Sequence, residues 1–244
     1  INKLNFKLTN DQKKSLSDIN KDLSSNSKMF RLLQGDVGSG KTIVALISAL
    51  SVINSNFQVA LMAPTEILAS LWLARQHYTL AKKLFPENIS IELLSSKSEN
   101  IDKKRIINEL KNNKIKMIFG THAIFQKKIL FNKLGYIIID EQHKFGVRQR
   151  KLLSDKGGDN CDVLLMSATP IPRTLTMSVY GDMDVSIIRE KPNNRKEVKT
   201  YSKLETKMDD VIKFVKKEIT EGNQVFWVCP LIEESKKLDH QSSV

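Results

Sequence analysis

A glycine-rich segment near the beginning of the chain has residue types that can bind phosphate groups. Its outer glycines, a lysine and a threonine follow the spacing of a phosphate-binding loop, G-x-x-x-x-G-K-T. In such a loop the glycines let backbone N–H groups turn toward phosphate oxygens, the lysine reaches the β and γ phosphates, and the threonine hydroxyl binds Mg²⁺. The segment predicts a site for ATP and Mg²⁺ that comprises Gly35, Asp36, Val37, Gly38, Ser39, Gly40, Lys41 and Thr42.

Two acidic residues later in the chain could complete this chemistry. Asp140 and Glu141 follow the apolar run YIII, and acidic residues at the carboxyl end of a parallel strand emerge where ligands bind in such sheets. Asp140 could hold Mg²⁺ through its water shell, while Glu141 orients or deprotonates the attacking water. Together with Lys41, these two residues predict hydrolysis of the bound nucleotide.

Short apolar runs alternate with helical patterns, and this alternation predicts the elements that position both segments. The runs are continuously hydrophobic, as in strands that are buried on both faces of a sheet. We expect an α/β fold, a RecA-like P-loop NTPase domain whose mostly parallel sheet has helices on both faces. Strands are expected at residues 31–34, 58–62, 91–95, 116–120, 136–140, 163–167 and 185–189, and helices at 42–53, 66–85, 102–112 and 172–180.

The pattern changes after the last of these strands. The segment 190–199, EKPNNRKEVK, combines a proline with mixed charge and predicts an interdomain linker. We therefore assign residues 1–191 to the nucleotide-binding domain and residues 192–244 to the linker and the start of a second RecA-like domain. That second part is expected to be incomplete, because its two strands (198–201, 224–232) and one amphipathic helix (207–221, ended by Gly222) cannot close a core.

Composition excludes some classes of protein and leaves one question open. The 41% of hydrophobic residues suffice for a core, but no apolar run is long enough to span a membrane, so no membrane partner is expected. The two cysteines predict no disulfide framework and fit a reducing cytoplasm. His77, His122 and His240 have no metal-ligand spacing with them, so no zinc site is expected. The net charge of +12 indicates either a polyanionic partner or scattered, solvated lysines.

Five segments resemble the ordered motifs of superfamily-two helicases. DEQH at 140–143 is similar to their DExH box, and SATP at 167–170 to motif III, which links the ATP and nucleic-acid sites. APTEILA at 63–69 and GTHAIFQ at 120–126 resemble motifs Ia and Ib, which in that superfamily lie along one strand of the nucleic acid. FKLTNDQ at 6–12 resembles the adenine-recognition segment.

This resemblance implies roles for particular residues. Phe6 and Gln12 would bind the cofactor, with Gln12 as the reader of the base edge. His143 would contact motif III and help to sense the γ-phosphate, or else be an exposed loop histidine. Arg148 and Arg150 would either meet phosphate or be solvated. The DNA-contact and coupling residues that the resemblance implies are Pro64, Thr65, Glu66, Gly120, Thr121, His122, Ser167, Ala168 and Thr169.

Three longer segments resemble the RecG family of bacterial DNA translocases: DEQHKFGVRQR, MSATPIPRTL and VFWVCPLIEES. The resemblance implies an ATP-dependent helicase or translocase that acts on branched DNA, such as stalled forks and Holliday junctions, in repair and recombination. It also implies a monomeric protein of the bacterial cytoplasm, associated with the nucleoid. The family's wedge domain would precede Ile1, and its arginine fingers would follow Val244, so the 244 residues alone are expected to be weak or inactive.

One departure and three alternatives accompany this resemblance. The residues Ser70–Arg75 look like an insertion that lengthens the helix after motif Ia by about a turn and a half and could rotate its face. A nucleotide-binding fragment without motor activity is one alternative function. The motor of a transcription–repair coupling factor is another, although its box usually reads DEEQ. An RNA helicase is the third, and the segments FGVRQR and PIPRTL weigh against it.

Overall fold

The structure, a computed structural model, describes residues 6–63, 69–94, 100–126, 128–140, 161–169, 183–190 and 198–228. The chain divides into two compact units, Ile1–Arg195 and Lys196–Val244. The division lies inside the segment 190–199, whose sequence predicts a linker. The assignment of the second unit to a RecA-like domain stays a prediction.

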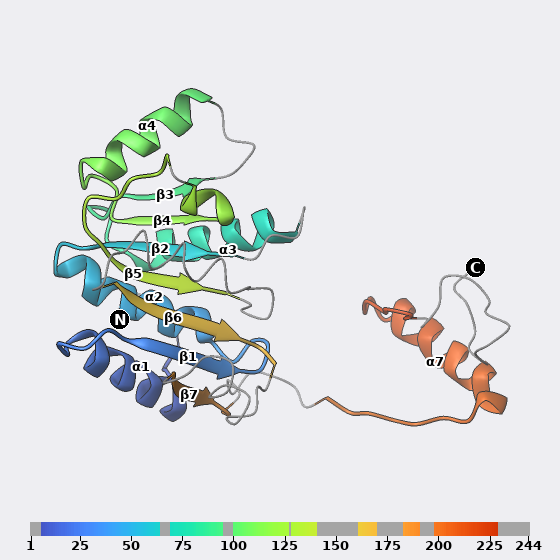
Figure 1. The fold of residues 1–244 in the computed structure, drawn as a ribbon. Helices are drawn as coiled ribbons and strands as arrows, with labels where there is room; N and C mark the ends of the chain where they lie inside the picture. Colours follow the sequence, from blue (N-terminus) through green and yellow to red (C-terminus); the bar gives the residue numbers. More distant parts are fainter. Residues whose placement is uncertain are drawn as a thin grey trace, which may run out of the picture. The chain divides into compact units, whose positions relative to one another are not determined.

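The first unit is built on a seven-stranded sheet in which neighbouring strands are parallel (Figure 1). In spatial order the strands are β3 (Ile91–Leu94), β4 (Met117–Gly120), β2 (Gln58–Met62), β5 (Leu134–Ile139), β6 (Asp162–Ser167), β1 (Phe30–Gly35) and β7 (Asp184–Ile188). The expected parallel sheet is confirmed, and each expected strand is present with small shifts at its ends. Because all strands run the same way, their carboxyl ends share one edge.

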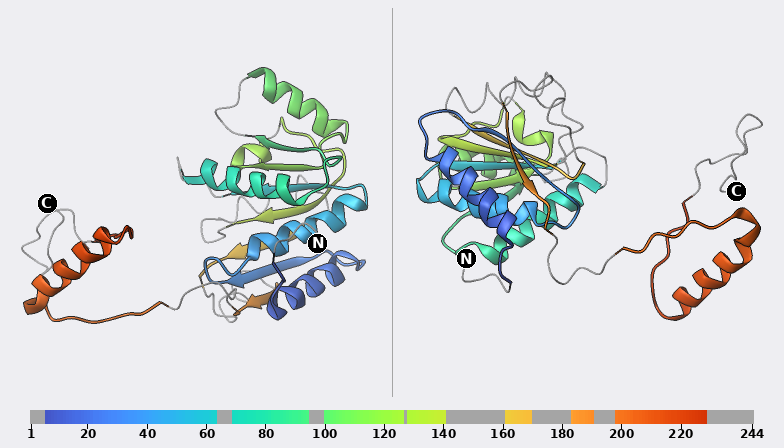
Figure 2. Two further views of the ribbon diagram at one scale, coloured as in Figure 1. Left: turned by 180° about the vertical axis from the view of Figure 1, so that it is seen from behind. Right: turned by 90° about the horizontal axis from the view of Figure 1, so that it is seen from below.

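Helices cover both faces of this sheet, as expected (Figure 2). One face is covered by α1 (Asn10–Leu23), α2 (Lys41–Asn54) and α3 (Ala69–Leu84). The other is covered by α4 (Asn100–Lys111) and the short 3₁₀ helix η1 (His122–Phe125). The helix expected at 172–180 lies outside the described residues. No helix in the described ranges is long and apolar enough to cross a membrane.

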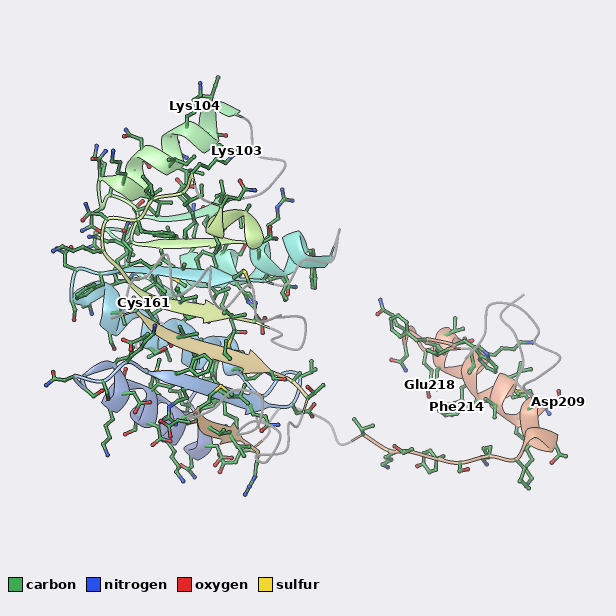
Figure 3. The ribbon with its side chains drawn as sticks, viewed as in Figure 1. Lys103, Lys104, Cys161, Asp209, Phe214 and Glu218 are labelled. Carbon is green, nitrogen blue, oxygen red and sulfur yellow. The ribbon has the colours of Figure 1, made fainter. Side chains whose placement is uncertain are left out.

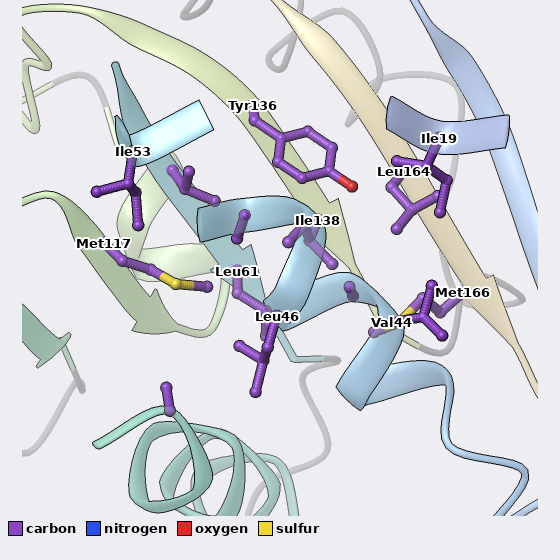
Figure 4. Close-up of a cluster of buried hydrophobic side chains, with 14 of the residues drawn as sticks. Ile19, Val44, Leu46, Ile53, Leu61, Met117, Tyr136, Ile138, Leu164 and Met166 are labelled. Atoms are coloured by element: carbon purple, nitrogen blue, oxygen red, sulfur yellow. The ribbon is translucent and has the colours of Figure 1, made fainter. Parts of the chain in front are cut away.

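Two hydrophobic cores result, one on each face of the sheet. Successive side chains of a strand point to opposite faces, so Tyr136 and Ile138 of β5 lie in the core under α1 to α3 (Figure 4). Ile137 and Ile139 of the same strand lie in the core under α4. This use of both faces explains why the strand sequences are continuously apolar.

The second unit differs from its sequence-based prediction in its strands. The expected helix is present as α7 (Met208–Thr220), and Gly222 follows it in a left-handed conformation (φ +83°). The prediction of a strand at 198–201 is wrong. The second predicted strand, 224–232, is described only for residues 224–228, and these do not form a strand either. A strand forms only against a partner, and none is present among residues 198–228. None of the apolar side chains described for α7 is buried, and several are exposed, including Phe214 (Figure 3).

Candidate nucleotide-binding site

The phosphate-binding loop joins β1 to α2 at the carboxyl edge of the sheet. Gly40 caps α2 in a left-handed backbone conformation (φ +89°), without a side-chain hydrogen bond. This conformation strains any residue with a Cβ, and a Cβ at Gly40 would also collide with the amide of Gln12. Glycine is therefore required directly before the first turn of α2, and helix amino ends of this kind bind anions.

Two buried donors in the loop fit a phosphate ligand. Nζ of Lys41 donates hydrogen bonds to the carbonyl oxygens of Gly35 (2.6 Å) and Asp36 (3.0 Å). Oγ of Ser39 is buried and has no hydrogen-bond partner among the described residues. Phosphate oxygens are acceptors that suit both groups. Thr42, the expected Mg²⁺ ligand, is half-buried in the first turn of α2.

The adenine-recognition segment is tied directly to this loop. Nε2 of Gln12 donates to the carbonyl oxygen of Ser39 at 2.7 Å, and its Oε1 accepts from the backbone N–H of Thr9 at 3.0 Å. The Thr9 hydroxyl accepts from the backbone N–H of Gln12 in return, which completes a capping box at the start of α1. Phe6 is 53% exposed. The base-reading role of Gln12 stays a prediction, while its structural role as a link to the loop is visible.

Asp11, the residue before Gln12, ties the start of α1 to the end of β7. Oδ2 of Asp11 accepts hydrogen bonds from the backbone N–H groups of Arg189 (2.8 Å) and Glu190 (3.0 Å), just after β7. These two bonds lower the pKa of Asp11 below its usual value, and the bond from Arg189 has the larger effect. The start of α1 is therefore fixed both to the loop and to the edge strand.

Asp140, the expected Mg²⁺ carboxylate, lies at the end of β5 and is 7% exposed. Its backbone N–H donates to the carbonyl oxygen of Met62 at 2.9 Å. Its Oδ2 lies 2.8 Å from Nε2 of His77 on α3, a contact that the sequence did not suggest. Glu141 and His143, together with Arg148 and Arg150, lie outside the described residues.

The strand order places the predicted motif III between the loop and the acidic residue. β6 lies between β1 and β5 in the sheet, and Ser167 ends β6. Oγ of Ser167 accepts from the backbone N–H of Thr169 at 3.2 Å. The carbonyl oxygen of Thr169 accepts from Nε2 of Gln34, next to the loop, at 3.0 Å. A short hydrogen-bonded turn that includes Ala168 thus connects β6 with the loop strand.

The predicted nucleic-acid segments follow two adjacent strands. The backbone N–H of Ala63, after β2, donates to the carbonyl oxygen of Gly120 at 2.9 Å. A Cβ at Gly120 would stand 2.6 Å from the carbonyl oxygen of Leu94, so this close approach requires glycine. Thr121 is half-buried and precedes η1, where His122 begins the helix. Pro64, Thr65 and Glu66 lie outside the described residues.

Residues Ser70–Arg75, which the resemblance suggests are an insertion, lie within α3. The helix runs through them to Leu84 without interruption, and Trp72 among them is 62% exposed. Beyond them, the helix still brings His77 to Asp140. The insertion itself stays a prediction, while this buried contact with the expected catalytic edge is present.

Sequence reasoning missed two features of this edge, and a signal existed for each. The segment TNDQ at 9–12 has the capping-box pattern that starts a helix, yet α1 was not expected. Ala74, His77 and Ala81 are spaced three and four residues apart, which marks a buried helix face. A polar residue on such a face needs a partner, and this could have singled out His77.

The sheet and the loop define a nucleotide-binding domain, and a family model shows that it is of the helicase class. The model of the family described as DEAD/DEAH box helicase matches residues 9–178, more than half of the chain. The chain therefore belongs to the DEAD/DEAH box helicase family.

Within this family, the chain is similar to RecG helicases. The chain is 49% identical to the ATP-dependent DNA helicase RecG of Aquifex aeolicus (strain VF5), over 98% of this chain and 30% of that protein. It is 47% identical to that of Bacillus subtilis (strain 168), over 100% of this chain and 35% of that protein. The chain thus spans about a third of the length of these curated relatives. The resemblance to RecG is confirmed.

Solved structures agree in fold. A structure of RecG bound to a three-way DNA junction is similar with a TM-score of 0.77 and 42% identity, over 90% of this chain and 29% of that chain. The DEAD-box helicase Mss116, bound to ssRNA and UDP-BeF, has a TM-score of 0.58 and 20% identity, over 88% of this chain and 48% of that chain. The second similarity shows the fold alone.

Proposed function

We propose that this chain is the ATP-binding motor segment of an ATP-dependent DNA helicase or translocase that acts on branched DNA in repair and recombination. The observation that carries this proposal is the identity of 49% with a RecG helicase along 98% of the chain. The phosphate-binding loop and the buried Asp140 support it chemically. Action on chromosomal DNA would place the protein with the nucleoid.

The residues of the first unit have separate tasks in this proposal. Lys41 leaves its loop carbonyls and contacts the β and γ phosphates, while backbone N–H groups at the start of α2 bind phosphate oxygens. Thr42 and Asp140 hold Mg²⁺, which neutralises charge on the phosphates when bound. Glu141 positions and deprotonates the attacking water. His143 links the acidic segment to the turn at Ser167–Thr169.

DNA would lie against the ends of β2 and β4. The proposed contacts come from Pro64, Thr65 and Glu66 after β2, and from Gly120, Thr121 and His122 after β4. The hydrogen bond between Ala63 and Gly120 supports this pairing, because it holds the two segments next to each other at one edge. The net charge of +12 supports a polyanionic partner.

The 244 residues alone should bind nucleotide and hydrolyse it slowly. In this family's chemistry an arginine from a second domain stabilises the transition state, which is worth about 10³- to 10⁵-fold in rate in comparable systems. We place that arginine, and the parts that separate DNA strands, in regions of the relatives beyond the matched third. Fork DNA should accordingly stimulate hydrolysis by this chain little.

The experiment is nucleotide binding measured with a fluorescent ATP analogue. The wild-type chain should bind it, and Lys41→Ala should weaken binding strongly because the phosphates lose their cation. Lys104→Ala, a matched loss of one exposed lysine on α4 (Figure 3), should bind as the wild type does. Brisk hydrolysis with branched DNA would contradict the need for a second domain, and equal binding by the Lys41 and Lys104 variants would contradict the site.

A further inference from the structure

His77 is a buried histidine on the face of α3 that packs on the sheet. It lies between Ala74 and Ala81, both of which are fully buried, and α3 packs on β3 and β4. The residue itself is 6% exposed. An imidazole in such a place must hydrogen-bond within the protein.

The hydrogen bond of His77 reaches the carboxylate at the end of β5. Nε2 of His77 and Oδ2 of Asp140 are 2.8 Å apart, and the two side chains are 7% and 9% exposed. An ionised carboxylate can only accept, so Nε2 carries the proton and donates. The backbone of Asp140 is fixed independently by its N–H bond to Met62. The imidazole therefore constrains the side chain of Asp140 at Oδ2.

On the basis of the proposed function, we propose that His77 is a positioning residue of the Mg²⁺ site. It holds the Asp140 carboxylate in the orientation that binds the ion. Carboxylates and imidazoles around metals commonly depend on such outer hydrogen bonds, whose loss costs about 10- to 100-fold in metal affinity or activity. The helix that carries His77 begins at Ala69, the last residue of the segment proposed to contact DNA. The same side chain thus joins the Mg²⁺ carboxylate to the element that follows the DNA contact.

A purely structural histidine would behave differently, and the difference is measurable. A structural role predicts that loss of His77 weakens the whole fold and nucleotide binding alike. A positioning role predicts a weaker response to Mg²⁺, with unchanged stability and unchanged nucleotide affinity in the absence of Mg²⁺. The 244-residue chain is therefore titrated with Mg²⁺ at a fixed concentration of fluorescent ATP analogue, and the affinity for the analogue is measured separately in EDTA.

His77→Ala should raise the Mg²⁺ concentration that gives half of the maximal change in analogue fluorescence. The expected increase is about tenfold, the lower end of the range for outer hydrogen bonds. The affinity of this variant for the analogue in EDTA should equal that of the wild type. His77→Gln, which keeps an N–H donor, should recover most of the Mg²⁺ response. If the alanine variant does not fold, His77→Leu fills the space without a donor and should show the same loss.

Two controls separate the possible failures. Gln76→Ala changes the exposed neighbour on the same helix and should leave the Mg²⁺ response unchanged. Lys41→Ala should lose binding with and without Mg²⁺; if the wild type also fails to bind, the proposed function fails and this inference with it. If the wild type binds but His77→Ala or His77→Leu responds to Mg²⁺ normally, or loses affinity equally in EDTA, the positioning role alone is overturned.

Discussion

Gln12 donates a 2.7 Å hydrogen bond to the carbonyl oxygen of Ser39, and this bond joins the first turn of α1 to the phosphate-binding loop. The two residues lie 27 positions apart in the chain. The glutamine is 2% exposed, and its Oε1 accepts a hydrogen bond from the backbone N–H of Thr9. The side chain is thus fixed at both ends, and the conformation of the loop depends on it.

Replacement of this glutamine should loosen the loop. Gln12→Ala should lower the free energy of unfolding by about 1–3 kcal/mol, because the buried carbonyl of Ser39 loses its donor. It should also weaken binding of a fluorescent ATP analogue. Urea unfolding and nucleotide titration measure the two effects.

A matched variant at Thr9 separates the loop contact from the helix cap. Thr9→Ala removes the capping hydroxyl but keeps the bond from Gln12 to Ser39, so it should cost about 0.5–2 kcal/mol of stability and leave nucleotide affinity unchanged. Equal losses of affinity in both variants would show that Gln12 acts only through α1. If Gln12 also reads the base, its alanine variant should lose any preference for ATP over GTP.

Tyr136 supplies a second prediction, in the core under α2. Its hydroxyl lies 3.0 Å from Oγ of Ser48, and both side chains are fully buried. Burial raises the pKa of the phenol well above its usual value, with the Ser48 bond opposing part of this shift. Tyr136→Phe should lower the free energy of unfolding by about 0.5–1.5 kcal/mol, the net worth of a hydrogen bond.

The cost should remain modest because Ser48 keeps its bond to the carbonyl oxygen of Ala45 at 2.9 Å. Tyr201→Phe, the same change at a tyrosine that is 75% exposed, serves as the control and should leave the urea midpoint unchanged. A loss above about 3 kcal/mol at Tyr136, more than an unsatisfied buried group usually costs, would mean that the hydroxyl has a larger role in the core than this single bond explains.

Asp162, at the start of β6, should give the stability a dependence on pH. Burial raises the pKa of its carboxyl above the usual value, although the backbone N–H of Met29 opposes this with a bond to Oδ1 of 2.7 Å. Between the unfolded and folded pKa values, the folded chain binds more protons than the unfolded chain. This group's contribution to stability therefore falls as the pH rises through that window.

Asp162→Asn removes the titration and keeps an oxygen that can accept from Met29. Relative to the wild type, the variant should become more stable as the pH rises from 4 toward 7, as measured by urea unfolding at each pH. Asp162→Ala should lose the Met29 bond and be less stable than Asp162→Asn throughout. A constant difference between the asparagine variant and the wild type would rule out a raised pKa.

The strands of the first unit were predictable because each is apolar on both faces, which follows from the sheet lying between two helical layers. The phosphate-binding loop was predictable because its chemistry is contained in eight adjacent residues. The contact between His77 and Asp140 joins residues 63 positions apart. No local pattern specifies that contact, since it depends on how α3 packs across the sheet.

The second unit shows where prediction from the sequence failed. Val198 and Tyr201 have side chains that favour strands, but they are 74% and 75% exposed and in no strand. Propensity for a strand reflects fit to a partner surface rather than an intrinsic backbone preference. The helix α7 was predictable because its hydrogen bonds are internal to the segment.

The strand order has a consequence for synthesis on the ribosome. β1, which leads into the phosphate-binding loop, pairs with β6 and β7. Asp162, the first residue of β6, lies 133 positions after Met29, the residue that precedes β1. At about 5–20 residues per second, β1 waits roughly 7 to 27 seconds for its first neighbour. The strand is among the earliest to be made and among the last to find a partner. A chaperone that shields residues 30–35 on the nascent chain would therefore protect the part of the protein that later holds the nucleotide.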